Sequence, residues 1–315
     1  MKINSISASR QKTFDLCKYK YILTYCLYCC HDCQRTVYDS EFLNDVKKCP
    51  YCRSDNITKV DMKSNFGAEH GTGLHWVLEC YANGIREKEE DGTKLTKKQI
   101  KEYLHWRENV EDVWRPNPKF KEGKEFNLLN LVKKDEDPDK LKIESFNLIE
   151  EYLARQSSIY VPEKILGVES EFNIDLGEVD MLGTKMLAKG FMDFVYKIND
   201  DSIEMIDYKF GKKTQTYDEV YSDYQSKIYS MALRQLYPGY KNYYLTFDYM
   251  RGKPISVCYT DDDGVATKKD LIEKWKQIVR PQVITRNIGW HCNALCDKKL
   301  CDREWPLFQN KFGGK

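Results

Sequence analysis

The sequence predicts an α/β protein in which a mixed central sheet is flanked by helices. Three short segments rich in β-branched and aromatic residues follow one another between residues 165 and 210. Apolar residues at helical spacing precede and follow them, and two more strand-like segments come before a last helix. Runs of helices around a strand meander are typical of α/β or α+β domains. The 315 residues are enough for one such domain, which we expect to span 1–315.

The N-terminal half is predicted to be mostly helical. Helical patterns cover residues 9–25, 65–85 and 141–156. Between the first two lies a cysteine-rich insert, residues 26–57, which is too small to form its own core without a metal.

The predicted sheet begins after residue 160. The segments 165–175, 186–198 and 202–210 are the three consecutive strands, and Asp200 and Asp201 form the turn between the second and third. A helix is expected from Tyr217 to Ile228, then strands over 242–250 and 254–260, and a closing helix over 268–285.

Composition excludes the simplest electrostatic functions. Lys and Arg number 50 and Asp and Glu 49, so the net charge is +1 and a uniformly basic protein that coats DNA is excluded. No apolar run reaches the ~18–20 residues that a membrane helix needs, and the first residues lack the apolar region of a signal peptide. We therefore expect an intracellular, cytoplasmic protein of a phage or prokaryotic host, with no membrane partner. Clustered cysteines in such a compartment usually bind metal.

Acidic residues and a lysine share one part of the predicted sheet. Asp207 and Lys209 are two apart in a strand and so point to one face, and hairpin pairing brings Asp193 on the neighbouring strand next to Asp207. Close carboxylates repel, and a divalent cation such as Mg²⁺ or Mn²⁺ relieves that repulsion. The alternative is a plain Asp–Lys ion pair with an unrelated aspartate.

Four short motifs together resemble the PD-(D/E)XK nuclease superfamily. They are GTGLHWVLE at 71–79, GFMDFVY at 190–196, IDYKFGK at 206–212 and QSKIY at 225–229. The combination is most similar to the RecB-like branch, which includes the RecB and AddB nuclease domains, CRISPR-associated RecB-like exonucleases and phage relatives. The resemblance implies a restriction-endonuclease-like core.

The resemblance also implies the roles of the site residues. His75, Asp193 and Asp207 would be side-chain metal ligands, and Tyr208 would offer its backbone carbonyl. Asp193, Asp207 and Lys209 would be catalytic, with Gln225 and Tyr229 on the DNA-binding side. Glu171 is a weaker candidate for a second metal or a water, and His70 does not match the motif.

Three cysteines near the C-terminus, within 289–305, are one short of the usual four-cysteine cluster. They are Cys292, Cys296 and Cys301. Cys17 is the natural fourth, and iron–sulfur members of the RecB-like family are similar in having one N-terminal and three C-terminal cysteines. The resemblance thus implies a 4Fe–4S cluster that joins the chain ends. The middle cysteine is displaced by one position from the family spacing, so zinc or a lost cluster remains an alternative.

The insert at 26–57 has the spacing of a zinc ribbon. Two C-x-x-C pairs make a tetrahedral four-thiolate site for Zn²⁺, namely Cys30, Cys33, Cys49 and Cys52. Cys26 and Cys29 form a competing first pair, so the register of that knuckle stays open. The ribbon is expected to brace the fold or to guide DNA.

These observations favour a metal-dependent deoxyribonuclease that acts on DNA, as an exonuclease on single strands or ends. Recombination, repair, phage DNA processing or CRISPR adaptation would be its setting, with a recombination or CRISPR-adaptation protein as partner. One alternative is a nuclease-like subunit that binds nucleic acid without cleaving it, and another is an iron–sulfur redox protein. Tyr217, Tyr221 and Tyr224 either stack on bases or, as helical spacing favours, belong to the core.

Overall fold

The computed structural model describes residues 5–38, 48–60, 66–87, 132, 136–156, 158–179, 185–279, 284–289, 292 and 296–312. The chain forms two compact units, which we describe separately. Unit 1 comprises residues 1–63, 173–189 and 265–315, and unit 2 comprises residues 64–172 and 190–264. Among the described residues, no helix combines the length and the apolar character needed to cross a bilayer.

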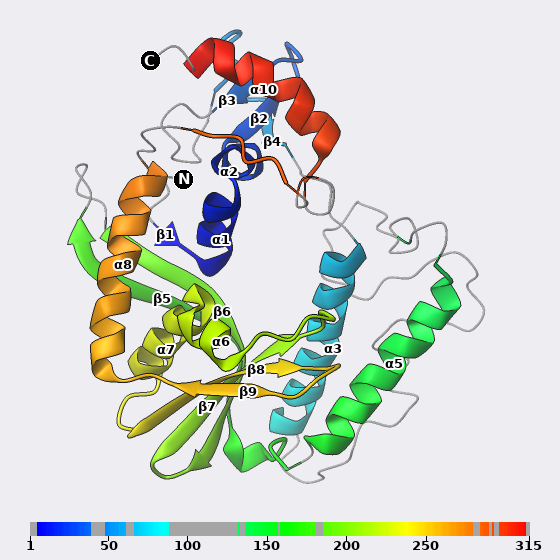
Figure 1. The fold of residues 1–315 in the computed structure, drawn as a ribbon, viewed down its shortest axis with the longest axis vertical. Helices are drawn as coiled ribbons and strands as arrows, with labels where there is room; N and C mark the ends of the chain where they lie inside the picture. Colours follow the sequence, from blue (N-terminus) through cyan, green and yellow to red (C-terminus); the bar gives the residue numbers. More distant parts are fainter. Residues whose placement is uncertain are drawn as a thin grey trace. The chain divides into compact units, whose positions relative to one another are not determined.

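Unit 2 contains most of a mixed sheet (Figure 1). β6 (Lys185–Asn199) and β7 (Ser202–Lys209) form an antiparallel hairpin, β7 and β8 (Asn242–Tyr249) are parallel, and β9 (Ile255–Cys258) is antiparallel to β8. β5 (Ile165–Val179) also pairs with β6. A parallel pair needs a long crossover. The crossover from β7 to β8 is formed by α6 (Tyr217–Ser222) and α7 (Tyr224–Leu236).

Two helices pack against this sheet through a common core. They are α3 (Phe66–Glu87) and α5 (Pro138–Arg155), and Asp137 caps α5 with its side chain. A short 3₁₀ turn, η2 (Pro162–Lys164), leads into β5. The buried residues that α3, α5 and the sheet contribute to one cluster include Leu74, Val77, Leu78, Phe146, Ile149, Tyr152, Phe194, Ile206 and Tyr208.

Unit 1 contains the N-terminal helices, a small sheet and the C-terminal helix. The helices are α1 (Ala8–Leu16), α2 (Lys18–Tyr25), the larger part of α8 (Asp261–Val279) and α10 (Lys298–Phe312). β2 (Leu27–Cys30) lies between β3 (Thr36–Tyr38) and β4 (Ile57–Lys59) as an antiparallel ribbon. α10 lies over this ribbon (Figure 1), and Thr36 on β3 donates a hydrogen bond to Glu304 on α10. β1 (Ser5–Ile6) pairs in parallel with β6.

The predicted elements are present, with differences that local hydrogen bonds explain. The helix expected over 9–25 is divided at Cys17, whose extended backbone ends α1 and begins α2. The helix expected from Tyr217 is divided at Asp223, which caps α7. The helix predicted over 268–285 is α8, which begins at residue 261 rather than 268, because Thr260 and Asp263 exchange capping hydrogen bonds there. β1 and α10 were not predicted.

His70 links α3 to α5 in unit 2. Its Nε2 lies 2.6 Å from Ser145 Oγ, which itself donates to the Leu141 carbonyl. The Ser145 oxygen therefore accepts the hydrogen bond from His70, which requires a proton on Nε2. Burial, together with the Arg251 charge, lowers the pKa of His70 to about 4. His70 is thus a neutral structural histidine at physiological pH, as its poor match to the motif implied.

We expect the free energy of unfolding to decrease as the pH falls from about 6.5 to about 4. The native pKa of His70 is below its unfolded value of about 6.5, so the native state disfavours the proton that the unfolded state accepts. The full effect over that window is about 3 kcal/mol. Urea titrations at several pH values measure it, with His70→Gln as the control because glutamine keeps a donor for Ser145. A variant profile as steep as the wild-type one would contradict this role.

Candidate active site and cysteine sites

The β6–β7 hairpin brings the two predicted aspartates together. Its register pairs Phe194 with Ile206, and one further step places Asp193 opposite Asp207. The backbone N–H of Tyr208 donates to Asp193 Oδ2 at 2.9 Å. Both carboxylates are buried, with exposed fractions of 8% for Asp193 and 2% for Asp207. This juxtaposition is the one that the sequence predicted.

Asp207, Lys209 and two residues of α7 form one polar network. Lys209 Nζ makes an ion pair with Asp207 Oδ2 and donates to Gln225 Oε1 at 3.0 Å. Gln225 Nε2 donates to Asp207 Oδ1 at 2.8 Å and to the Tyr229 hydroxyl at 2.9 Å. The break at Asp223 fixes the start of α7, because its side chain accepts from the Gln225 N–H. Gln225 therefore hydrogen-bonds to both Asp207 and Lys209 and holds the two side chains beside each other.

A second group of potential metal ligands adjoins this network. His75 on α3, Glu169 on β5 and Asp193 place one ligand atom each within 4.8 Å of one another. His75 Nδ1 lies 3.1 Å from Asp193 Oδ2. Among the described residues, Asp207 is not part of this set, since Lys209 and Gln225 occupy its oxygens.

Glu169 corrects the choice of acidic residue on β5. The sequence pointed to Glu171, but that side chain is exposed and does not join the group. Glu169 has a positive φ of 45°, a left-handed conformation that interrupts the alternation of a strand. Alternation along β5 would place Glu169 and Glu171 on one face, so it could not tell which of the two joins the site, although the nearness of Glu169 to Glu171 was a signal.

The charges of this site depend on one another. Burial raises the pKa of Asp207, and the Lys209 charge opposes that rise. Burial lowers the pKa of Lys209, but Asp207, Asp193 and Asp223 together raise it by more, so the net shift is upward and the ammonium stays charged. Burial likewise lowers the pKa of His75, whereas Asp193, Asp207 and Glu169 raise it, to about 9 overall. The carboxylates thus require positive charge near them.

The donor set fits a hard divalent cation. Two carboxylates and one imidazole converge at one point, and oxygen ligands suit Mg²⁺ or Mn²⁺. Lys209 lies beside the group with its charge intact, held at 4.3 Å from the centroid of the Phe247 ring. Such an arrangement can stabilise negative charge on a phosphate and orient a water molecule.

The ribbon cysteines converge as a four-thiolate site needs. Cys30, Cys33, Cys49 and Cys52 bring their sulfurs within 4.8 Å of one another. The Cys30–Cys52 and Cys33–Cys49 sulfur distances are 3.5 and 3.6 Å. Four sulfurs around a tetrahedral zinc, at about 2.3 Å each, stand about 3.8 Å apart. The geometry selects Cys30 and Cys33 for the first knuckle, and Cys26 and Cys29 lie outside the set.

The pKa of one ribbon thiol, that of Cys49, is lowered. Burial raises the pKa of Cys49, but backbone N–H groups of Cys52 and Tyr51 point at its sulfur and bring that pKa down to about 7. The thiolate form is the one that binds a metal.

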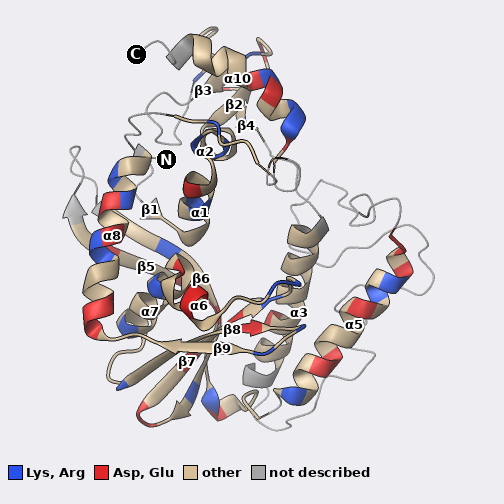
Figure 2. Cartoon of the chain, viewed as in Figure 1, with Lys and Arg blue, Asp and Glu red and all other residues tan. Residues whose placement is uncertain are grey.

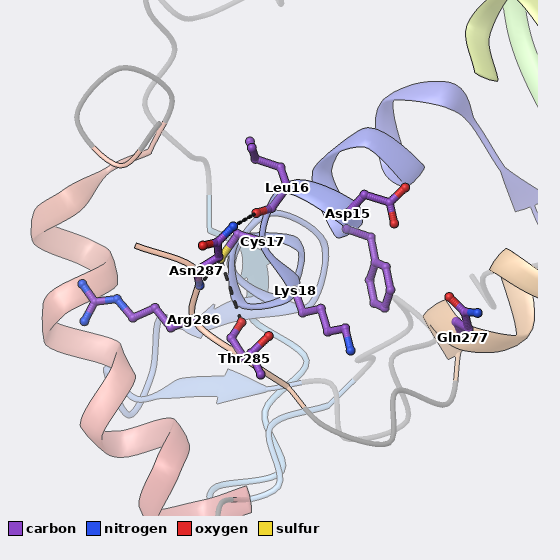
Figure 3. A pocket seen from close by; sticks show the side chains of 9 residues that line it. Asp15, Leu16, Cys17, Lys18, Gln277, Thr285, Arg286 and Asn287 are labelled. Carbon is purple, nitrogen blue, oxygen red and sulfur yellow. Dashed lines mark hydrogen bonds between the residues drawn. The ribbon is translucent and has the colours of Figure 1, made fainter. Parts of the chain in front are cut away.

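Two of the four cysteines predicted to hold a cluster, Cys17 and Cys292, contact the short segment 284–289 of unit 1. Cys17 Sγ accepts hydrogen bonds from the N–H groups of Lys20 and Asn287, both at 3.4 Å, and Cys292 Sγ donates to the Asn287 carbonyl at 3.7 Å. Figure 3 shows Cys17 beside Asn287 and Thr285, on the wall of a cavity of about 350 Å³.

Cys296 and Cys301 belong to the same neighbourhood. Burial raises the pKa of Cys296, Lys20 lowers it, and Cys292, Cys301 and Cys17 each raise it. Burial raises the pKa of Cys301, and the Arg286 charge opposes this. Within the part of the chain that is described, these four sulfurs are not drawn together within 4.8 Å as the ribbon sulfurs are.

Fold and site define an α/β protein with a buried acidic site for a divalent cation beside a lysine. Residues 5–302 match the model of the PD-(D/E)XK nuclease superfamily, and the chain therefore belongs to that superfamily. No curated protein matches the sequence.

Two solved structures are similar to this chain. A candidate exonuclease from Eubacterium rectale is 14% identical, with a TM-score of 0.43 over 95% of this chain and 88% of its own. SSO0001 is 12% identical, with a TM-score of 0.32 over 51% of this chain and 76% of its own. At these TM-scores neither structure bears on the assignment of the site.

Changing Glu169 to glutamine should weaken Mn²⁺ binding roughly tenfold or more, because the charged ligand oxygen is lost. Isothermal calorimetry on the purified protein measures the affinity. Glu171→Gln is the matched control, since it removes the same charge from an exposed position two residues along β5. If the two variants bound Mn²⁺ equally well, Glu169 would not be a ligand.

Proposed function

We propose that the protein is a metal-dependent deoxyribonuclease that hydrolyses phosphodiester bonds at single strands or ends of DNA. The observation that carries the proposal is that a group of potential metal ligands lies next to a network that holds a charged lysine. The Asp207–Lys209–Gln225 network adjoins the ligand group of His75, Glu169 and Asp193. Membership of a nuclease superfamily supports a nucleic acid as the substrate.

Each residue has a chemical task in this proposal. The residues that would hold Mg²⁺ or Mn²⁺ are His75, Glu169, Asp193 and Asp207, with the Tyr208 carbonyl as a further ligand. Such an ion would polarise the scissile phosphate and lower the pKa of the attacking water. Lys209 stabilises the negative charge that develops on the phosphate oxygens, and Gln225 keeps the lysine and Asp207 in register. Tyr229 lines the DNA side of the site through its bond to Gln225.

Asp207→Ala and Lys209→Ala should each abolish cleavage of end-labelled single-stranded DNA in Mn²⁺ or Mg²⁺. The first removes a ligand oxygen and the second removes the cation that faces the phosphate. Gel assays with chelator as a blank measure the rate, and circular dichroism checks the fold.

Lys241→Ala is the matched control. This exposed lysine directly precedes β8 and forms an ion pair with the Asp201 carboxylate. It should cut at the wild-type rate. Cleavage by either site variant at the wild-type rate would overturn the assignment. A wild-type protein that binds DNA but never cuts it would favour the alternative, a nuclease-like binding subunit.

The cysteine sites support the RecB-like branch with an iron–sulfur cluster. We infer that Cys17, Cys292, Cys296 and Cys301 hold a 4Fe–4S cluster. The backbone donors to Cys17 and the charges of Lys20 and Arg286 suit an anionic group such as a thiolate-bound cluster. We assign Zn²⁺ to the four ribbon cysteines, with a structural or DNA-guiding role.

Protein purified without oxygen should contain about four iron and four sulfide per chain and about one zinc. Cys17→Ser should lose the iron and melt many degrees lower, because a cluster that joins distant segments restricts the unfolded chain, by roughly 5–6 kcal/mol on the chain-entropy model. Cys80→Ser, on α3 outside both sites, should keep the iron. Metal analysis and anaerobic melting of the same samples test this. Equal iron in the Cys17 variant and wild type would remove Cys17 from the cluster.

A further inference from the structure

Three tyrosines of unit 2 form a stack of nearly parallel rings. The Tyr221 and Tyr259 rings are 4.9 Å apart between centroids with an interplanar angle of 17°. The Tyr217 and Tyr221 rings are 6.1 Å apart at 14°. Tyr259 is buried, Tyr221 is partly buried, and Tyr217, the outer member, is 53% exposed. Of the two interpretations of Tyr217, Tyr221 and Tyr224, base stacking or core, the exposure of Tyr217 is at odds with the core interpretation for that residue.

Hydrogen bonds hold the inner rings in place. The Tyr259 hydroxyl donates to the Tyr221 carbonyl at 2.8 Å, and the Tyr221 hydroxyl donates to Asp263 Oδ1 at 2.8 Å. Asp263 is itself held, because its other oxygen accepts from Thr260. The outer ring begins α6, whose first turn is closed by a capping box between Thr216 and Glu219. The stack is therefore ordered before any ligand arrives, which reduces the entropic cost of binding.

The charges around Tyr217 favour a base over a phosphate on its ring. The first turn of α6 carries Asp218 and Glu219, seen as red at that helix in Figure 2. Lys212 and Lys213 are exposed in the loop that follows Lys209. Lys213, with 83% of its side chain exposed, also forms an ion pair with Glu219 at 3.6 Å, which a phosphate would have to share. A nucleic-acid strand can place its phosphates at these lysines and a base on the ring.

The stack lies close to the candidate active site along the chain. Asp223 lies six positions after Tyr217, a rise of about 9 Å along α6, and it caps the helix that carries Gln225. Lys209, the two lysines, Tyr217, Tyr221 and Gln225 thus follow one another in the connection between β7 and β8, and Tyr259 joins the stack from the residues after β9.

We propose that Tyr217 is a stacking platform for a nucleobase of single-stranded DNA beside the active site. The inference rests on the proposed nuclease function and specifies how the strand is held. A base on Tyr217 adds a fourth parallel ring to the stack. Aromatic–base stacking does not depend on sequence, because every base has a π-face. The site would therefore prefer single strands or frayed ends, whose bases are free to stack, without reading their order.

The test measures binding of a fluorescein-labelled thymidine 12-mer by anisotropy, in Ca²⁺ to separate binding from cleavage. Tyr217→Ala should weaken binding roughly 5- to 100-fold, and Tyr217→Phe, which keeps the ring, should remain near wild type. Leu236→Ala is the matched control, since it truncates another exposed apolar side chain of the same unit and should have no effect. An abasic 12-mer, which keeps the phosphates, should bind the Tyr217→Ala variant and the wild type equally.

Equal affinity of the Tyr217→Ala variant and wild type for the thymidine 12-mer would overturn the proposal. A loss of affinity that is as large with the abasic strand would also overturn it, because the ring would then not be acting on bases. Failure of the nuclease function is distinguishable. In that case wild-type protein cuts no DNA in Mn²⁺, while the ring-dependent binding in Ca²⁺ is still measured.

Discussion

The burial of Asp193 and Asp207 on adjacent strands is the constraint on which unit 2 depends. Two carboxylates with little solvent repel each other, so each needs its own compensation. Asp193 receives the Tyr208 N–H and the His75 imidazole, and Asp207 receives the Lys209 ammonium and the Gln225 amide. These donors come from β7, α3 and α7, so one electrostatic requirement fixes where three elements converge. A hydrophobic core alone would not set their register so closely.

Unit 1 meets a different constraint. The ribbon contributes only a small buried cluster, formed by Tyr28, Cys30, Val37 and Cys49, and two of these are candidate metal ligands. So little apolar area cannot offset the entropy of ordering the segment, which is why four thiolates around an ion suit it. The two units therefore use ligands differently. In unit 2 packing holds the fold and the site adds chemistry, whereas in the ribbon the site replaces packing.

The sequence predicted the strands and the main site because both follow simple periods. Asp193, Asp207 and Lys209 lie where alternation along a hairpin places them. It could not choose Glu169 over Glu171, because alternation places both on one face and only the left-handed backbone at Glu169 separates them. It also could not predict the divisions at Cys17 and Asp223, because side chains there cap a helix inside an unbroken apolar pattern. The first zinc knuckle had two possible registers on spacing alone. Only the fold of the β2–β4 ribbon distinguishes Cys30 and Cys33 from Cys26 and Cys29.

The parallel step from β7 to β8 explains why the proposed substrate-binding and catalytic residues share one segment. A parallel pair requires a crossover, and here the crossover must begin where β7 ends, at Lys209. The residues of α6 and the first turn of α7 are then connected to Lys209 by a short length of chain. If α6 and α7 formed one continuous helix, Gln225 would have no cap at Asp223 to set its direction toward Asp207. The break between α6 and α7 therefore has two consequences. Tyr217 on α6 is exposed to solvent, and Gln225 on α7 is directed toward Asp207.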